Sequence, residues 1–280
     1  MVGVELRQAR RQAQVRLVAL DLDGALSRSD GTISPRTRHA LRSAQGRGLG
    51  LAFVTARPPR RVRRIAQDLG LTGVAICGSG STVYDLETSG LVRDYRLRAE
   101  HASLLVQCLR NAVPEVAFAV ELGASYAREA SYTPAREYPD DGLDPCLTRV
   151  GNVLELCRDG VTKLFVQQPD WPLSELFNMT YAFAAGRATV AYCGSDLVEV
   201  SAPGVSRTYA LAVYCLEHGI AAEEVIAFGD KPNDLPMLRW AGCGIAVANA
   251  HPELLAAADV VTRSSDADGV ALVLERLGQA

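Results

Sequence analysis

Short apolar runs alternate with segments of helical spacing in the first part of the chain. Ser34 followed by Pro35 predicts the start of one helix, and Pro58 with Pro59 opens a second. Around these helices lie three runs rich in Val, Leu and Ile that are too short to be helices, at 15–21 (VRLVALD), 49–56 (LGLAFVTA) and 73–77 (GVAIC). Such runs indicate strands buried on both faces. Strands alternating with helices predict parallel pairing through right-handed crossovers.

The same alternation returns after residue 206, with strands expected at 225–230, 244–248 and 259–262 and helices at 206–218, 233–242, 251–258 and the C-terminal end. Residues 88–193 differ. They contain a helical stretch (AEHASLLVQCLRNA), strand-like VAFAVEL and VTKLFVQQ, a polar loop (REYPDDGLDP) and a helix after Trp171-Pro172. We therefore predict an α/β fold with a doubly wound, Rossmann-like parallel-sheet core formed by residues 1–87 and 194–280. Residues 88–193 are expected to form an inserted α/β cap domain.

Composition narrows the class of protein. With 280 residues and 48% hydrophobic content, the chain is long enough for two compact units. A net charge of −3 gives no global basic field for nucleic acid. The arginine cluster within residues 60–64 is interpreted as a solvated helix face. The sequence sets no oligomeric state.

The cysteines and the N-terminus bear on location. Seven scattered cysteines without a C-x-x-C pair favour free thiols in a reducing cytoplasm over a disulfide framework or a zinc site. The arginines at positions 7, 10 and 11 precede no apolar signal-peptide core, and no apolar run approaches the length of about 18 residues that a membrane span needs. We expect a cytoplasmic protein without a membrane partner and interpret the N-terminal segment as a solvated extension.

Polar residues follow the predicted strands where each one ends. Asp21 and Asp23 come after the first strand, Thr55 after the second, and Asp230 after VIAFGD. Because ligands bind beyond the carboxyl ends of parallel strands, these side chains are expected to converge. Converging acids need a compensating cation, and carboxylates without His or Cys favour Mg²⁺.

Each motif also has an ordinary interpretation. A D-x-D can cap a loop, a strand-end threonine can bond to backbone, and GDKPND can form a turn and a helix cap. The order and placement of all three favour a functional site.

Four segments in order, DLDGAL, VTARP, GVSRTYAL and GDKPNDLPML, resemble the four signature motifs of the haloacid dehalogenase-like phosphohydrolases. The insertion resembles the large α/β cap of the Cof-type, subclass IIB members, and CGSGSTVYD resembles the segment that precedes this cap. The resemblance covers roughly residues 15 to 275 and implies a Mg²⁺-dependent phosphatase.

The resemblance also implies roles for individual residues. Asp21 would be the nucleophile that forms an aspartyl-phosphate, and Asp23 the general acid and base. Magnesium would be held by Asp21, the backbone carbonyl of Asp23 and Asp230, with Asp234 in support. The phosphate would be bound by Thr55, Ala56, Arg207 and Asn233.

Four positions depart from the family pattern. Ala25 and Ala56 are small changes, and Ser79 stands where the family usually has asparagine. Arg207 stands where the family has a lysine that binds both nucleophile and phosphate, although a chain with only two lysines, Lys163 and Lys231, has favoured arginine throughout.

The favoured function is a phosphatase of a small phosphorylated metabolite, a sugar phosphate or related monoester. The alternatives are a catalytically weakened homologue that binds a phosphorylated ligand as a sensor, and a phosphomutase.

Overall fold

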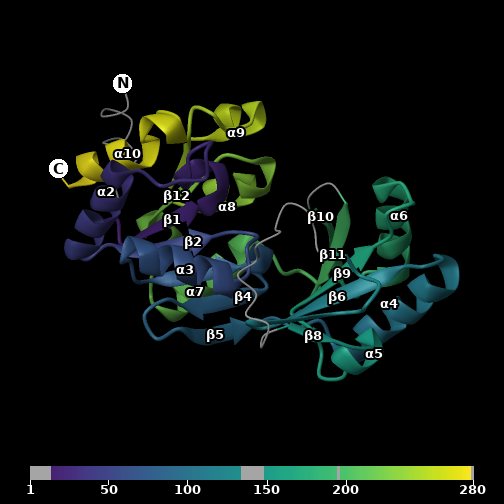
Figure 1. The fold of residues 1–280 in the computed structure, drawn as a ribbon. Helices are drawn as coiled ribbons and strands as arrows, with labels where there is room; N and C mark the ends of the chain where they lie inside the picture. Colours follow the sequence, from purple (N-terminus) through teal and green to yellow (C-terminus); the bar gives the residue numbers. More distant parts are fainter. Residues whose placement is uncertain (1–13, 134–147, 194–195, 279–280) are drawn as a thin grey trace. The chain divides into compact units, whose positions relative to one another are not determined.

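The computed structural model describes residues 14–133, 148–193 and 196–278 (Figure 1). The chain divides into two compact units, each built around its own sheet. The first comprises Met1–Arg57, Val62–Gly90 and Arg207–Ala280, and the second comprises Pro58–Arg61 and Leu91–Ser206. The expected polar loop at 136–145 and the N-terminal extension lie outside the described residues.

The sheet that contains β1 has eight strands in the order β14-β13-β12-β1-β2-β3-β4-β5, and all of them except β5 belong to the first unit. The six from β14 to β3 are parallel: β1 (Leu17–Asp21), β2 (Gly50–Val54), β3 (Val74–Cys77), β12 (Val225–Gly229), β13 (Cys243–Ala246) and β14 (Val260–Val261). The chain adds β2 and β3 on one side of β1 and β12, β13 and β14 on the other. The strand order therefore reverses at β1, where ligands bind in such sheets. The predicted α/β class with a parallel-sheet core is confirmed.

Two further strands of this sheet were not predicted. β4 (Thr82–Asp85) runs antiparallel to β3, and β5 (Gly90–Asp94) forms the edge. The segment CGSGSTVYD thus continues the sheet by a tight reversal after β3.

Helices connect the parallel strands and follow the last one. They are α2 (Pro35–Gly46), α3 (Pro59–Leu69), α7 (Arg207–Glu217), α8 (Leu235–Trp240), α9 (Pro252–Ala257) and α10 (Gly269–Leu277). α2 packs against α10, and α7 packs against α8. Every residue of β1 and β12 is buried, as their apolar sequences predict. The predicted cap of α2 is confirmed, because the Ser34 side chain accepts a hydrogen bond from the backbone N–H of Thr37 (2.9 Å).

The second unit has a six-stranded sheet in the order β10-β11-β9-β6-β7-β8. Its elements are α4 (Ala99–Ala112), β6 (Ala117–Leu122), β7 (Ser125–Arg128), β8 (Thr148–Val150), α5 (Val153–Leu156), β9 (Lys163–Gln167), α6 (Leu173–Ala184), β10 (Thr189–Cys193) and β11 (Leu197–Ser201). Apolar residues that alternate along the strands, such as Phe118, Leu164 and Val198, join a core with residues of α4 and α6. The helices expected at α4 and α6 and the strands expected at β6 and β9 are present.

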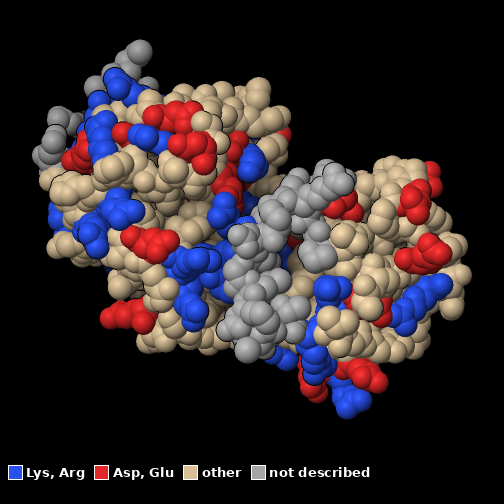
Figure 2. All heavy atoms as spheres, in the orientation of Figure 1, with Lys and Arg blue, Asp and Glu red and all other residues tan. Residues whose placement is uncertain are grey.

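The structure also bears on the expectations about disulfides, membrane helices and nucleic acid. None of the six cysteines among the described residues forms a disulfide. None of the helices in the described ranges has the length and apolar character to cross a membrane. On the face drawn in Figure 2, basic and acidic side chains lie among one another. The expectation that nucleic acid is not a partner stays a prediction.

Candidate active site

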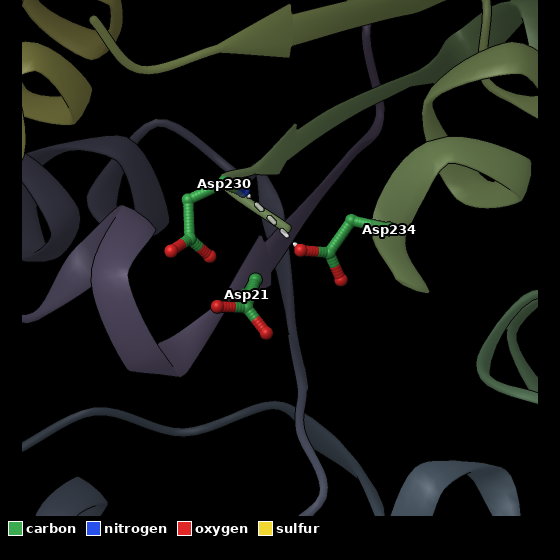
Figure 3. A group of neighbouring side chains, drawn as sticks. All are labelled: Asp21, Asp230 and Asp234. Carbon is green, nitrogen blue, oxygen red and sulfur yellow. Dashed lines mark hydrogen bonds between the residues drawn. The ribbon is translucent and has the colours of Figure 1, made fainter. Parts of the chain in front are cut away.

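Two neighbouring strands bring the first acids together. β1 ends at Asp21, and Asp230 follows directly after β12, which pairs with β1 in parallel register (Leu20 opposite Phe228). Asp234 comes from the single turn before α8. The three residues are buried, and one carboxylate oxygen from each lies within 4.8 Å of the others. Figure 3 shows their carboxylates gathered around a common point.

Two glycines permit this close approach. Gly24 has φ 103°, and a Cβ at this position would lie 2.0 Å from Asp230 Oδ2. A Cβ at Gly229 would lie 2.5 Å from the Cβ of Asp234. The chain can therefore turn beside Asp230 after β1 only because residue 24 lacks a side chain and tolerates a positive φ.

Asp234 is fixed by hydrogen bonds. Its Oδ2 accepts from the backbone N–H groups of Asp230 and Lys231, both at 3.2 Å. Its Oδ1 accepts from Arg207 Nη1 at 2.6 Å, and the same Arg207 nitrogen donates to Asp21 Oδ1 at 3.0 Å. Arg207 is the first residue of α7, and its side chain is only 12% exposed. A buried cation thus joins the expected nucleophile to Asp234.

Burial dominates the protonation of these acids. It raises the pKa of Asp21 well above the usual value, the neighbouring Asp234 raises it further, and Arg207 opposes the shift. Burial also raises the pKa of Asp230, partly offset by Lys231. Without further positive charge, burial therefore favours the protonated forms of Asp21 and Asp230.

The donor set fits a hard cation. Asp21 Oδ2 and Asp230 Oδ1 are buried and have no hydrogen-bond partner among the described residues. Buried carboxylate oxygens without partners are costly unless a cation compensates. An all-oxygen set without histidine or cysteine suits Mg²⁺.

Asp23 lies beside this group and is held by other cations. Arg57 Nε donates to Asp23 Oδ2 at 3.0 Å, and Arg57 Nη2 contacts Oδ1, so the ion pair is bidentate. Thr55 Oγ1 donates to Asp23 Oδ2 at 3.3 Å. Lys231 Nζ donates to the backbone carbonyl oxygen of Asp23 at 3.2 Å. The carboxylate of Asp23 is therefore oriented by Thr55 and Arg57.

The remaining predicted residues lie on the segments that form this site. Thr55 is fully buried at the end of β2, with its backbone N–H bonded to the carbonyl of Ile76 (2.9 Å). Ala56 and Asn233 are exposed next to Thr55 and Asp234. Ser79 donates its backbone N–H to the Thr55 carbonyl (3.0 Å) with φ 58°, a conformation that asparagine adopts more readily than serine.

Arg57 and Lys231 are not among the site residues that the sequence predicts. Both lie inside the quoted motifs VTARP and GDKPNDLPML. The signal for Lys231 was its rarity, since it is one of two lysines in the chain. For Arg57 the signal was a cation two residues after Thr55, which is expected at the same site as Asp21 and Asp23.

Comparisons with known proteins give relatives that match most of the chain. The HMP-PP phosphatase of Cronobacter sakazakii is 30% identical over 254 residues, which cover 86% of this chain and 87% of that protein. The stress response protein YhaX of Bacillus subtilis is 29% identical over 268 residues, with 92% of each chain covered. The pyridoxal phosphate phosphatase YbhA of Escherichia coli is 27% identical over 263 residues, covering 91% of this chain and 96% of that one.

Solved structures share the fold. A haloacid dehalogenase-like hydrolase from Bacteroides thetaiotaomicron superposes with a TM-score of 0.81 at 27% identity, over 94% of this chain and all of that one. A subclass IIB sugar phosphatase of the same superfamily superposes with a TM-score of 0.74 at 20% identity, over 94% of this chain and 99% of that one, which shows a common fold.

A family model described as haloacid dehalogenase-like hydrolase matches residues 18–274. This range includes all four motifs and both sheets. The predicted resemblance is confirmed, and relatives named as phosphatases support a phosphatase. The chain belongs to the haloacid dehalogenase-like hydrolases.

Proposed function

We propose that the protein is a Mg²⁺-dependent phosphatase that hydrolyses a small phosphorylated metabolite through an aspartyl-phosphate at Asp21. The observation that carries the proposal is the buried Asp21 carboxylate, with one oxygen bonded to Arg207 and the other without a partner among the described residues. Relatives named for their substrates act on pyridoxal phosphate and HMP-PP, so a small phosphate ester is the expected class. A sugar phosphate is our preferred candidate.

The metal would be held by Asp21, the backbone carbonyl of Asp23 and Asp230. Asp234, already bonded to Arg207 and to two backbone amides, would support the Asp230 segment. A bound magnesium ion would supply positive charge that offsets the repulsion between a carboxylate and a phosphate.

The residues of the chain supply the steps of hydrolysis. A carboxylate oxygen of Asp21 forms a bond to phosphorus while the bond from phosphorus to the ester oxygen breaks. Asp23 gives a proton to that leaving oxygen and then takes one from the attacking water, which releases phosphate and restores Asp21. Thr55, Ala56, Arg207 and Asn233 are assigned to the phosphate. Arg207 is suited to this task because a planar guanidinium can bond two oxygens at once.

Two further parts of the proposal concern setting. The inserted domain, residues 88–193, is proposed to select the leaving group. We also propose a cytoplasmic location, which suits cysteines that form no disulfide among the described residues. A catalytically weakened sensor is the second candidate because Arg207 replaces the family lysine. Turnover of a generic aryl phosphate distinguishes an enzyme from a sensor.

Replacing Asp21 by Asn should abolish phosphate release, with a loss of at least about 10³-fold, because an amide is neither a nucleophile nor an anionic ligand. Chelation of wild-type protein with EDTA should have a similar effect that added Mg²⁺ reverses. Phosphate release from an aryl phosphate measures both. Asp68→Asn, an exposed change on α3, is the matched control. Full activity of Asp21→Asn, or of wild type in EDTA, would contradict the mechanism.

Asp230→Asn should raise the melting temperature of the metal-free protein at neutral pH by roughly 2–4 °C, the shift that about 1 kcal/mol gives in a large domain. Burial raises the pKa of Asp230 above its unfolded value of 3.8, so folding stability is lost as pH rises through the folded pKa. The neutral amide of asparagine does not ionise, so the variant keeps this folding stability at neutral pH. The gain should shrink near about pH 4 and reverse in saturating Mg²⁺, which stabilises only the wild type. If Asp230→Asn melts at a lower temperature than wild type in EDTA, the buried charge of Asp230 does not destabilise the metal-free protein.

Arg207→Ala should lower kcat/KM by roughly 10²–10³, comparable to losing one electrostatic stabiliser. Its guanidinium joins Asp21 to Asp234, so its loss leaves both carboxylates without their cation. Arg207→Lys should retain measurable activity, and Arg38→Ala on the exposed face of α2 serves as control. An Arg207→Ala enzyme as active as wild type would remove the assignment. An inactive wild type restored by Arg207→Lys would favour the sensor.

Arg57→Ala should reduce turnover of alkyl phosphates more than that of aryl phosphates. Arg57 holds the Asp23 carboxylate by a bidentate ion pair, and an alkoxide leaving group depends on the proton from Asp23 far more than a phenoxide does. We expect losses of roughly 10²-fold and less than 10-fold, respectively. Asp23→Asn should give the same ordering. Equal losses on the two substrate classes would mean that Arg57 does not act through Asp23.

A further inference from the structure

Lys231 places a fixed positive charge at an oxygen assigned to the metal. Its Nζ donates to the backbone carbonyl oxygen of Asp23 at 3.2 Å, and its own backbone N–H is bonded to Asp234 Oδ2. The residue directly follows Asp230, and its charge acts on that carboxyl group. The other lysine, Lys163, lies in the second unit and is paired with Glu199, so Lys231 is the one lysine at the acid cluster.

The acid cluster next to Lys231 has the character of a cation site on two independent grounds. Three acidic side chains bring oxygens within 4.8 Å of one another. In addition, Asp21 Oδ2 and Asp230 Oδ1 are buried and have no hydrogen-bond partner among the described residues. A divalent cation that uses these oxygens and the Asp23 carbonyl must share that carbonyl with the ammonium group or displace it.

Sharing is electrostatically costly. An ammonium at hydrogen-bond distance from an oxygen that also binds a divalent ion lies only a few ångströms from that ion. Two unit charges about 4 Å apart in water repel by an amount that changes a binding constant roughly fivefold, and a divalent ion doubles the energy. Displacing the ammonium instead forfeits a hydrogen bond to a carbonyl. In both cases the metal binds more weakly than it would without Lys231.

We propose that Lys231 is an internal competitor of the divalent cation, which lowers the metal affinity of the site through the Asp23 carbonyl. The inference rests on the metal site of the proposed function. It gives a role to a cation in the GDKPND segment to which the proposed phosphoryl transfer assigns none. Metal occupancy would then follow the free Mg²⁺ concentration, because the lysine keeps the site from saturating at low metal.

The test is direct metal binding without substrate. Protein stripped with EDTA and dialysed is titrated with Mn²⁺, a paramagnetic ion that takes the same oxygen ligands, and free Mn²⁺ is measured by electron paramagnetic resonance. Lys231→Met should bind Mn²⁺ roughly 30-fold more tightly than wild type. Lys231→Arg, which keeps the charge, should stay within about threefold of wild type. Arg38→Met, which removes one exposed positive charge on α2, should leave the Kd unchanged.

The outcomes distinguish the competitor role of Lys231 from the existence of the metal site. An unchanged or weaker Kd in Lys231→Met, with wild type binding one Mn²⁺ that Asp230→Asn loses, overturns the competitor role and leaves the metal site standing. An equal gain in Arg38→Met would assign the effect to net charge and overturn it as well. Wild type that binds no Mn²⁺, or an Asp230→Asn variant that binds as tightly as wild type, overturns the metal site and the inference together. Lys231 is exposed, and matching thermal melts of all variants in EDTA verify that they are folded.

Discussion

Repulsion among buried carboxylates is the constraint on which the site depends. The reversal of strand order at β1 makes β1 and β12 neighbours, so Asp21 and Asp230 leave the sheet side by side. The turn after β1 approaches Asp230 so closely that only glycine fits at position 24. Burial then raises the pKa of both acids. Two buried carboxylates side by side lower the stability of the fold. Proteins keep such costly groups mainly at functional sites, so this pair indicates one.

Each of the two acids that carry the proposed chemistry is paired with its own arginine. Arg207 contacts Asp21, while Arg57 contacts the side chain of Asp23. Asp21 is almost fully buried and Asp23 is about one-third exposed. Two carboxylates only two residues apart therefore occupy different environments, and such a difference lets one act as a nucleophile while the other exchanges protons with solvent.

The sequence predicts the central strands and the acids that follow them, because β1, β2, β3 and β12 are continuous apolar runs that need no knowledge of their neighbours. β5 and β10 escape prediction since they are edge strands whose residues are mostly half-buried or exposed, so no burial pattern marks them. Motif order brings Asp21, Thr55, Arg207 and Asp230 to one place. The partners of Arg57 and Lys231 depend on loop geometry, which has no sequence period, so the sequence does not predict that they contact the side chain and the backbone carbonyl of Asp23.

Arginine at position 207 has a consequence beyond retained charge. One nitrogen, Nη1, bonds both Asp21 and Asp234, which a lysine ammonium could also do. Asp234 in turn accepts from the backbone N–H groups of Asp230 and Lys231. A continuous chain of hydrogen bonds therefore runs from Arg207 through Asp234 to the backbone of Asp230 and Lys231. Arg207 thus orients Asp234, which in turn holds the backbone of Asp230 and Lys231, as well as balancing the charge of Asp21.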